Sequence, residues 1–257
     1  MARNRWTREE LILALNLYLK LPFGKLHQRT PEIIDLAALI GRTPSSIAMR
    51  LNNYASVDEF HQSRGIGGLP GGKAQVEPIW NEFLSDREKM LFESEQILAG
   101  LEKLDLEEKY PELPFYNEDL LGKTQIREIK TRVNQQVFRQ MVLANYGFSC
   151  AITGINIPGL LIASHIIPWA DNEKERLNPE NGICLSPLYD SAFDQGFIGI
   201  TPDFKVILSD KLIPYHKQGY FLQHFDLIKG IRLRDAEKYK PKKEFLEWHF
   251  DNVFCRQ

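Results

Sequence analysis

The sequence predicts an α+β fold, in which a helical N-terminal domain precedes a C-terminal domain built on a small antiparallel hairpin. Two observations support this prediction. Apolar residues recur at helical spacing through most of residues 7–55 and 76–110. Between residues 148 and 200, by contrast, short apolar runs are separated by turn residues and a polar loop. The first pattern is typical of a packed helical unit, and the second of short strands followed by a helix.

We expect the helical domain to span residues 1–110 and the second domain to span residues 123–257. The residues between them, 111–122, contain two prolines and several polar residues, which are typical of a linker. A glycine-rich stretch at 63–72 lacks the Lys-Ser/Thr pair of a phosphate-binding loop, so we expect a flexible connection there.

The first helix is predicted after Thr7, which forms a capping-box pattern with Glu10. Two further helices are predicted to start at Thr30-Pro31 and Thr43-Pro44, with Gly41 ending the first of them. Residues 30–53 therefore have the order of a helix-turn-helix. On this interpretation polar residues of the last helix face a DNA groove, namely Ser45, Ser46, Arg50 and Asn53. The alternative is a plain three-helix packing unit.

The charge is distributed unevenly, although the net charge is only −2. Lys and Arg outnumber Asp and Glu eight to four in residues 1–56 and eighteen to fifteen in residues 122–257, while acidic residues lead fifteen to six between them. Binding to phosphate depends on local positive charge, so the net charge does not exclude DNA as a partner.

Other classes of protein are disfavoured by the composition. No apolar run reaches membrane-spanning length and no cationic-then-apolar leader is present, so we expect a cytoplasmic protein that does not contact a membrane. The three cysteines, Cys150, Cys184 and Cys255, are widely spaced and form no C-x-x-C pair. We therefore expect neither a disulfide framework nor a structural zinc site.

A long helix is predicted from Thr124 to about Gly147, because apolar residues keep helical spacing across it. Its other face carries cations that we expect to meet DNA phosphates: Arg127, Lys130, Arg132 and Arg139. A cationic helix face that is only solvated is the alternative interpretation. After this helix, the segment CAITG and the apolar stretch that ends near His165 are predicted to form two strands joined by a turn. Asn181-Gly182 is predicted to be a turn, and a helix is expected from about Ser186, with Pro187 in its first turn.

The segment SHIIPW, the segment NGICL with its Asn181 sixteen residues after His165, and the segment AFDQG together resemble the HNH, or ββα-metal, endonucleases. The preceding REIKTRVNQQVFRQMVLANYGFSCAITG and the tail PKKEFLEWHF are similar to the restriction-endonuclease branch of that family. The resemblance covers about residues 121–254.

The resemblance implies a role for each matching residue. His165 matches the general base, which takes a proton from the attacking water. Asn181 matches the residue that steadies the loop and orients the base. Asp190 stands where the family has a metal-binding His or Asn, and a carboxylate suits Mg²⁺ or Mn²⁺. Ser164 departs from the pattern, because many members have Asp there, so Asp194 becomes a further candidate ligand.

The resemblance thus implies an endonuclease that cuts double-stranded DNA, with or without base modification, using one divalent ion (Mg²⁺ or Mn²⁺) per site, in restriction or phage defence. Cutting both strands makes a homodimer plausible. Two alternatives stay open at this point: a DNA-binding protein with a degenerate HNH fold, and a nuclease for single-stranded nucleic acid or RNA.

Overall fold

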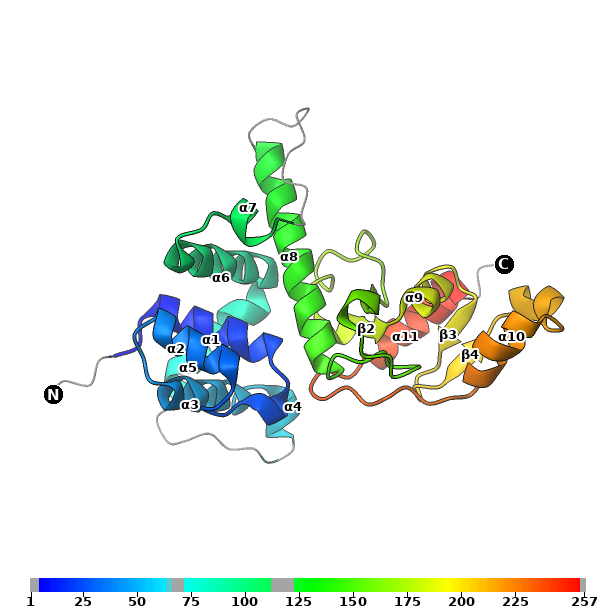
Figure 1. The fold of residues 1–257 in the computed structure, drawn as a ribbon, viewed down its shortest axis with the longest axis horizontal. Helices are drawn as coiled ribbons and strands as arrows, with labels where there is room; N and C mark the ends of the chain where they lie inside the picture. Colours follow the sequence, from blue (N-terminus) through cyan, green and yellow to red (C-terminus); the bar gives the residue numbers. More distant parts are fainter. Residues whose placement is uncertain (1–4, 64, 66–71, 112–122, 255–257) are drawn as a thin grey trace. The chain divides into compact units, whose positions relative to one another are not determined.

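The structure is a computed structural model that describes residues 5–63, 65, 72–111 and 123–254, with the backbone alone for 123–126. The helices are α1 (Arg8–Lys20), α2 (Pro31–Leu39), α3 (Pro44–Ala55), α4 (Glu59–Gln62), α5 (Lys73–Ser85), α6 (Arg87–Glu102), α7 (Leu106–Lys109), α8 (Lys123–Asn145), α9 (Pro187–Asp194), α10 (Gly219–His224) and α11 (Lys243–His249). The strands are β1 (Ile162–His165), β2 (Gly182–Leu185), β3 (Ile198–Ile200) and β4 (Val206–Leu208). Figure 1 shows their course, and the fold is α+β as the sequence predicts.

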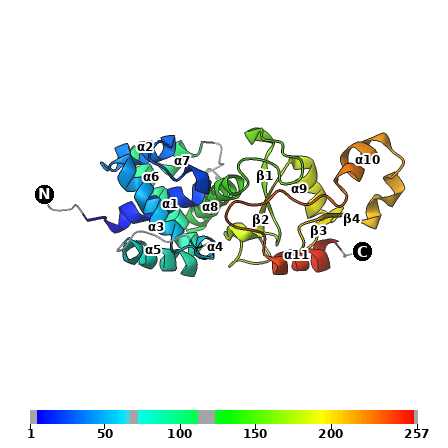
Figure 2. The same ribbon diagram turned by 90° about the horizontal axis from the view of Figure 1, so that it is seen from below.

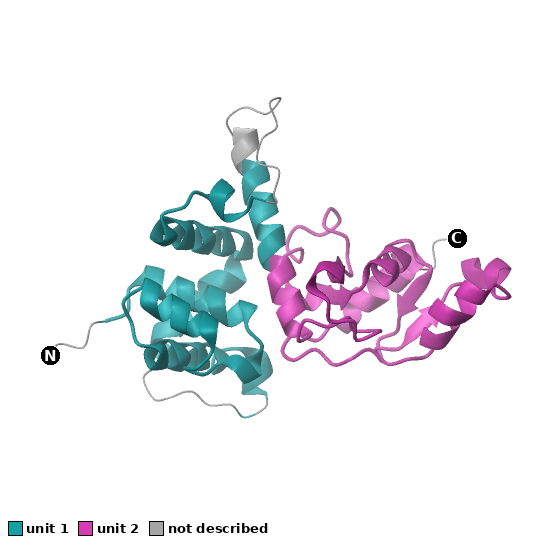
Figure 3. Ribbon diagram, in the orientation of Figure 1, with its two compact units in different colours: residues 1–137 teal, residues 138–257 magenta. Residues whose placement is uncertain are grey.

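The chain forms two compact units, residues 1–137 (unit 1) and residues 138–257 (unit 2), coloured separately in Figure 3. The division falls inside α8, later than the predicted linker, which lies outside the described residues except for Pro111. The N-terminal part of α8 belongs to unit 1 because it packs there. Val133 is buried against Tyr110, and the Asn134 side chain donates to the carbonyl of Glu88 at 2.9 Å.

Unit 1 is helical, and its first helices begin where the sequence predicts. Thr7 accepts a hydrogen bond from the amide of Glu10 while the Glu10 side chain accepts one from the amide of Thr7, which completes the capping box. Thr43 caps α3 by accepting from the amide of Ser46. Between α2 and α3, Gly41 has a φ of 68°, a left-handed conformation that side chains rarely adopt. The glycine-rich stretch lies mostly outside the described residues.

The core of unit 1 forms where α1, α3, α5 and α6 pack together. Tyr18, Tyr54 and Trp80 contribute one ring each from α1, α3 and α5, and their centroids lie 6.0 to 6.5 Å apart. All three side chains are buried, so α3 is covered on the face that carries Tyr54. Such aromatic contacts stabilise a core beyond the burial of apolar area.

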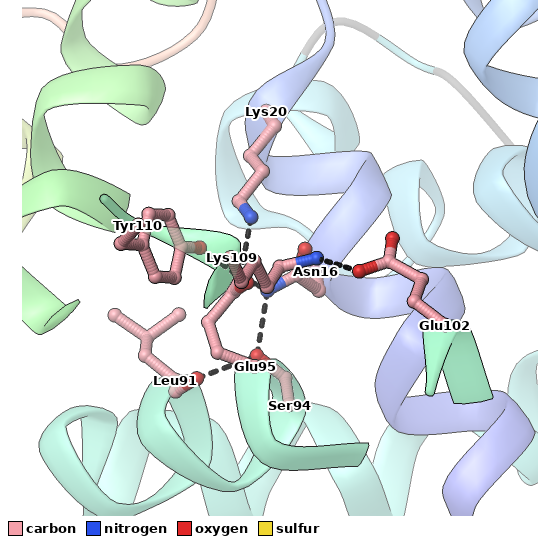
Figure 4. A network of polar contacts seen from close by, with 8 residues as sticks. All are labelled: Asn16, Lys20, Leu91, Ser94, Glu95, Glu102, Lys109 and Tyr110. Carbon is pink, nitrogen blue, oxygen red and sulfur yellow. Dashed lines mark hydrogen bonds and ion pairs between the residues drawn. The ribbon is translucent and has the colours of Figure 1, made fainter. Parts of the chain in front are cut away.

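A charged residue is also buried in unit 1, as Figure 4 shows. Glu95 of α6 has no exposed surface. Its carboxylate forms an ion pair with Lys20 and accepts hydrogen bonds from Asn16 at 2.7 Å and from Tyr110 at 2.5 Å. Burial raises the pKa of Glu95, but Lys20 and the two neutral donors outweigh it and hold the pKa below its usual value. The network therefore keeps an ionised carboxylate between α1, α6 and the residue that follows α7.

Unit 2 is built on β1 and β2, which pair antiparallel with His165 opposite Gly182 and Ile162 opposite Leu185. Figure 2 shows the two strands side by side, with α9 next to them. The strands of this hairpin are IASH and GICL, which the polar loop connects, and β2 is followed by α9. Pro187 opens α9 and Ser186 precedes it, as predicted.

Two predictions of local structure in this region, one strand and one turn, are wrong. CAITG forms a turn instead of a strand: the amide of Gly154 donates to the carbonyl of Cys150 at 2.9 Å, and Gly154 has a φ of 76°. Asn181-Gly182 is no hairpin turn, because Asn181 ends a short 3₁₀ segment, Pro179–Asn181, and Gly182 begins β2. The CAITG turn is held against β2, because the amide of Ala151 donates to the carbonyl of Cys184. At Asn181-Gly182 the pairing of β2 with β1 overrides the local turn signal.

A second hairpin, β3 with β4, follows α9, and the sequence analysis did not predict it. Its strands are three residues long, and Gly199 in β3 lies against Phe254, so little side-chain alternation marks them. The core of unit 2 lies among α8, the first hairpin and α9, and contains Phe138, Cys184, Leu185 and Phe193. Among the described residues, no helix is long and apolar enough to cross a membrane.

Candidate active site

The close approach of α8 to the first hairpin positions His165. Gly182 lies opposite His165, and a Cβ atom at Gly182 would stand 2.4 Å from Val142 and 2.9 Å from Phe138. The missing side chain therefore lets α8 pack directly onto β2. On this packed surface the imidazole of His165 stacks on the ring of Phe138, at 4.1 Å between centroids, and meets Trp169 edge-on at 5.5 Å.

The hydrogen bonding of His165 fixes which ring nitrogen is free. Nε2 lies 2.9 Å from the carbonyl oxygen of Arg176. Because a carbonyl only accepts, Nε2 carries the proton and donates, and Nδ1 is left with its lone pair. Burial lowers the pKa of His165, although the bond to the Arg176 carbonyl opposes the shift. The side chain is therefore a neutral imidazole near neutral pH, which is the form that accepts a proton.

Asn181 lies behind the site and holds the backbone that follows His165. It has no exposed surface, and its side chain accepts from the amide of Ile167 at 2.8 Å and donates to the carbonyl of Ile167 at 3.1 Å. Its own carbonyl accepts from the amide of Ile166. Three hydrogen bonds thus tie Asn181 to the two residues after His165, which is consistent with a role in positioning His165. Asn181 does not line the cavity described next.

A cavity of about 480 Å³ brings four of the candidate residues together. Its walls include Ser164 and His165 from β1 and Asp190 and Asp194 from α9, and Trp169 and His249 also line it. Asp190 and Asp194 are four residues apart on one helix, so both project from the same face. The sequence places these groups on separate elements, and the packing of α9 against β1 unites them.

The two carboxylates are held in surroundings that disfavour their charge. Burial raises the pKa of Asp190, while the hydroxyl of Ser164 acts in the opposite direction. Burial, and then repulsion from Asp190, raises the pKa of Asp194 to about 6. A cation bound between these carboxylates would relieve both the desolvation and the repulsion.

The donor set fits a hard divalent cation that keeps part of its water shell. Mg²⁺ is commonly held by one or two carboxylates, with water and substrate phosphate completing its coordination. Asp190 and Asp194 supply those carboxylates, whereas Ser164 offers a neutral hydroxyl that faces Asp190. In the described ranges no three His, Cys, Asp or Glu side chains group closely enough to enclose a metal ion. Cys150 and Cys184, the two described cysteines, are buried free thiols.

The Lys and Arg side chains of α8 that we predicted to contact DNA differ in whether other groups of the protein already bind them. Arg127 is exposed. Lys130 pairs with Glu88 at 3.4 Å, and Arg132 pairs with Glu128 at 3.5 Å. Arg139 donates to the backbone carbonyls of Leu161 at 2.5 Å and Pro158 at 3.2 Å, so it braces the chain entering β1.

On α3, the four predicted groove-facing residues divide between surface and interior. Ser45 is exposed, and Ser46 is half-buried. Arg50 is only 8% exposed and its guanidinium lies 4.6 Å from the centroid of the Trp6 ring, while Asn53 is 3% exposed. The packing of α3 against α1 and α5 places these two residues inward.

His249 also lines the cavity, although no sequence pattern predicted it as a site residue, since it has no partner at ligand spacing along the chain. Only the tertiary structure brings it to the cavity.

A hairpin that presents a neutral imidazole, followed by a helix whose carboxylates line the same cavity, defines a site of the nuclease class. Comparison with family models agrees: residues 150–201 match the model described as HNH endonuclease, which supports a nuclease domain in this part of the chain. The match contains both strands of the first hairpin, α9 and β3, and with them His165, Asn181, Asp190 and Asp194. No curated protein matches the chain.

A pH prediction follows from Asp194. Its pKa of about 6 lies above the usual value of an Asp, so in metal-free protein its ionisation destabilises the fold as pH rises through about 6. A divalent cation binds the ionised form. We therefore expect Mg²⁺ to raise the melting temperature clearly at pH 7.5 and much less at pH 5, as measured by differential scanning fluorimetry. Asp194→Asn should remove most of this difference, and an equal Mg²⁺ effect at both pH values in the parent protein would contradict the prediction.

Proposed function

We propose that this protein is a divalent-metal-dependent endonuclease that hydrolyses phosphodiester bonds of duplex DNA, in a restriction or phage-defence system. One observation carries the proposal: a single cavity is lined by the neutral His165, which can act as a base, and by the carboxylates of Asp190 and Asp194. These are the two kinds of group that water-driven phosphodiester cleavage requires, a proton acceptor and a holder for a cation.

The proposed reaction assigns each proton and bond. Nδ1 of His165 accepts a proton from water, whose oxygen forms a bond to phosphorus while the bond from phosphorus to the 3′ oxygen breaks. The leaving oxygen takes a proton from solvent, so the products carry a 5′-phosphate and a 3′-hydroxyl. Asp190 and Asp194 would hold a divalent cation, which when bound would stabilise the negative charge on the phosphate and the leaving oxygen. Asn181 keeps His165 in place through the backbone of Ile166 and Ile167.

The surface beside the cavity supports an extended substrate. A second hollow of about 600 Å³ shares Asp194, Pro168 and Val253 with the cavity and continues past Lys211 and Trp248. Lys211 offers positive charge there, and its ammonium group also donates to the carbonyl of Gln195 at 3.4 Å. A nucleic-acid backbone with one phosphate at His165 would have room for neighbouring nucleotides along this second hollow.

The direct test is plasmid cleavage by the purified full-length chain with Mg²⁺, Mn²⁺ or EDTA. We expect nicked or linear DNA with either metal and intact DNA with EDTA. Asp190→Ala should weaken metal binding by at least about tenfold and reduce cleavage accordingly. Asp203→Ala, an exposed carboxylate between β3 and β4, serves as the matched control and should cut like the parent protein.

The substrates are varied in the same assay, with unmodified duplex, duplex carrying modified bases, single-stranded DNA and RNA. Failure to cut any of them with any divalent metal would overturn the proposed activity and favour a DNA-binding protein with a degenerate site. Cleavage confined to single strands or RNA would overturn the duplex assignment alone.

For unit 1 we propose a role in selecting or gripping the target, with Ser45 and Ser46 as the two predicted contact residues of α3 that are not buried. Cutting both strands requires two sites or two visits, so we propose a homodimer on DNA. Sedimentation of the protein with and without duplex tests this assembly.

A further inference from the structure

His249 is the last residue of α11, and its role depends on the proposed metal-dependent function. The side chain is only 3% exposed, and it forms part of the wall of the cavity that contains Asp190 and Asp194. Neither the general base nor the two carboxylates require it. A buried imidazole in the wall of a cavity that also contains two carboxylates therefore needs a separate explanation.

The orientation of His249 is fixed by α9. Nε2 lies 3.1 Å from the carbonyl oxygen of Phe193, and the imidazole stacks on the Phe193 ring at 3.7 Å between centroids with an interplanar angle of 3°. Because the carbonyl only accepts, Nε2 carries the proton and Nδ1 keeps its lone pair. Phe193 stands between Asp190 and Asp194 in the sequence, so the same helix fixes the imidazole and both carboxylates.

We propose that His249 is a positioning residue of the metal site, whose Nδ1 accepts a hydrogen bond from a water molecule bound to the cation at Asp190 and Asp194. Direct coordination is not supported, because the described His, Asp and Glu side chains form no three-residue group around one point. The cavity of about 480 Å³ has room for intervening water. Mg²⁺ keeps several of its waters in proteins, and each held water needs an acceptor.

The chemistry of the imidazole suits this role. Burial lowers the pKa of His249 to about 4, against the opposing effect of the bond to Phe193, so the ring is neutral and able to accept at neutral pH. A histidine whose second nitrogen donates to a backbone carbonyl is held in one tautomer and one orientation, which is how protein metal sites commonly fix their imidazoles.

Two substitutions of His249 test the roles of its two ring nitrogens separately. The amide of Gln reaches the position of Nε2, so His249→Gln keeps a donor to the Phe193 carbonyl and loses the acceptor that faces the cavity. The shorter Asn places its amide at the position of Nδ1, so His249→Asn keeps a polar group toward the cavity and loses the bond to Phe193. Affinity for Mn²⁺ is measured by isothermal titration calorimetry on the full chain without DNA, and the melting temperature is measured without metal.

We expect His249→Gln to weaken Mn²⁺ binding by about tenfold while its metal-free melting temperature falls less than that of His249→Asn, since both variants lose the stack on Phe193 and only Gln keeps the donor to its carbonyl. His249→Asn should show the reverse, with near-parental Mn²⁺ affinity and a lower melting temperature. If a variant is partly unfolded, the titration is repeated at a temperature where circular dichroism shows the parental folded fraction.

A role limited to packing would give a different pattern, in which Mn²⁺ affinity follows the melting temperature in both variants. Parental Mn²⁺ affinity in His249→Gln overturns the inference and leaves the proposed function intact. A parent protein that binds no Mn²⁺ overturns the proposed metal dependence, and the role of His249 with it.

Discussion

Replacing His165 by Gln will lower the rate of phosphodiester cleavage by about 10²- to 10⁴-fold, the usual contribution of a general base. Gln keeps a donor near the Arg176 carbonyl, where Nε2 of His165 donates at 2.9 Å, but it offers no lone pair of comparable basicity at the position of Nδ1. The loss should therefore appear in the chemical step, measured under single-turnover conditions with saturating metal and DNA.

The pH profile of cleavage provides a second measure of the same residue. Burial holds the pKa of His165 below its usual value, so the parent activity should fall only when pH drops below the ordinary histidine range. His216→Ala is the matched control, because His216 is exposed and does not line the cavity. A His165→Gln variant that cuts at the parent rate would exclude His165 as the base, whereas a variant that loses Mn²⁺ affinity as well would show that the imidazole has a role in the metal site.

Replacing Lys20 by Met will lower the free energy of unfolding of unit 1 by about 3 kcal/mol, because it breaks a buried ion pair. This value is at the low end for such pairs, since the Lys20 side chain keeps 16% exposure. The substitution leaves the fully buried carboxylate of Glu95 with Asn16 and Tyr110 as its remaining donors. The free energy of unfolding is measured in urea by circular dichroism. Lys73→Met is the control, because Lys73 and Glu77 form an exposed ion pair at 3.7 Å. Its loss should lower the free energy of unfolding by roughly a few tenths of a kcal/mol.

A double variant tests the cause of this loss. Lys20→Met with Glu95→Gln removes both charges, so most of the lost stability should return. The pH dependence has a definite sign: the pKa of Glu95 is lowered by folding, so its contribution is present above the pKa of the unfolded chain and is lost as pH falls. A Lys20→Met protein as stable as the parent, or a double variant no more stable than Lys20→Met, would contradict this account of the network.

The local signals in the sequence identified most of the helices. Thr7 with Glu10, Thr43 with Pro44, and Ser186 with Pro187 are start signals that act within one helical turn, and each stands at the start of a helix in the structure. The same signals failed at the hairpin. The strand Gly182–Leu185 forms because it pairs with β1, and the turn preference of Asn181-Gly182 does not outweigh that pairing.

The sequence by itself determined the α+β class, the residue types of the candidate site and the spacing that resembles HNH nucleases. The tertiary structure decided which of those residues share a space. It placed Ser164, His165, Asp190 and Asp194 around one cavity, kept Asn181 behind it, and turned Arg50 and Asn53 of α3 inward. It also brought His249 of α11 to the carbonyl of Phe193 in α9, fifty-six residues away along the chain. Caps and turns depend on neighbours a few residues apart, whereas burial and the sharing of a cavity depend on how whole elements pack, which no short sequence pattern contains.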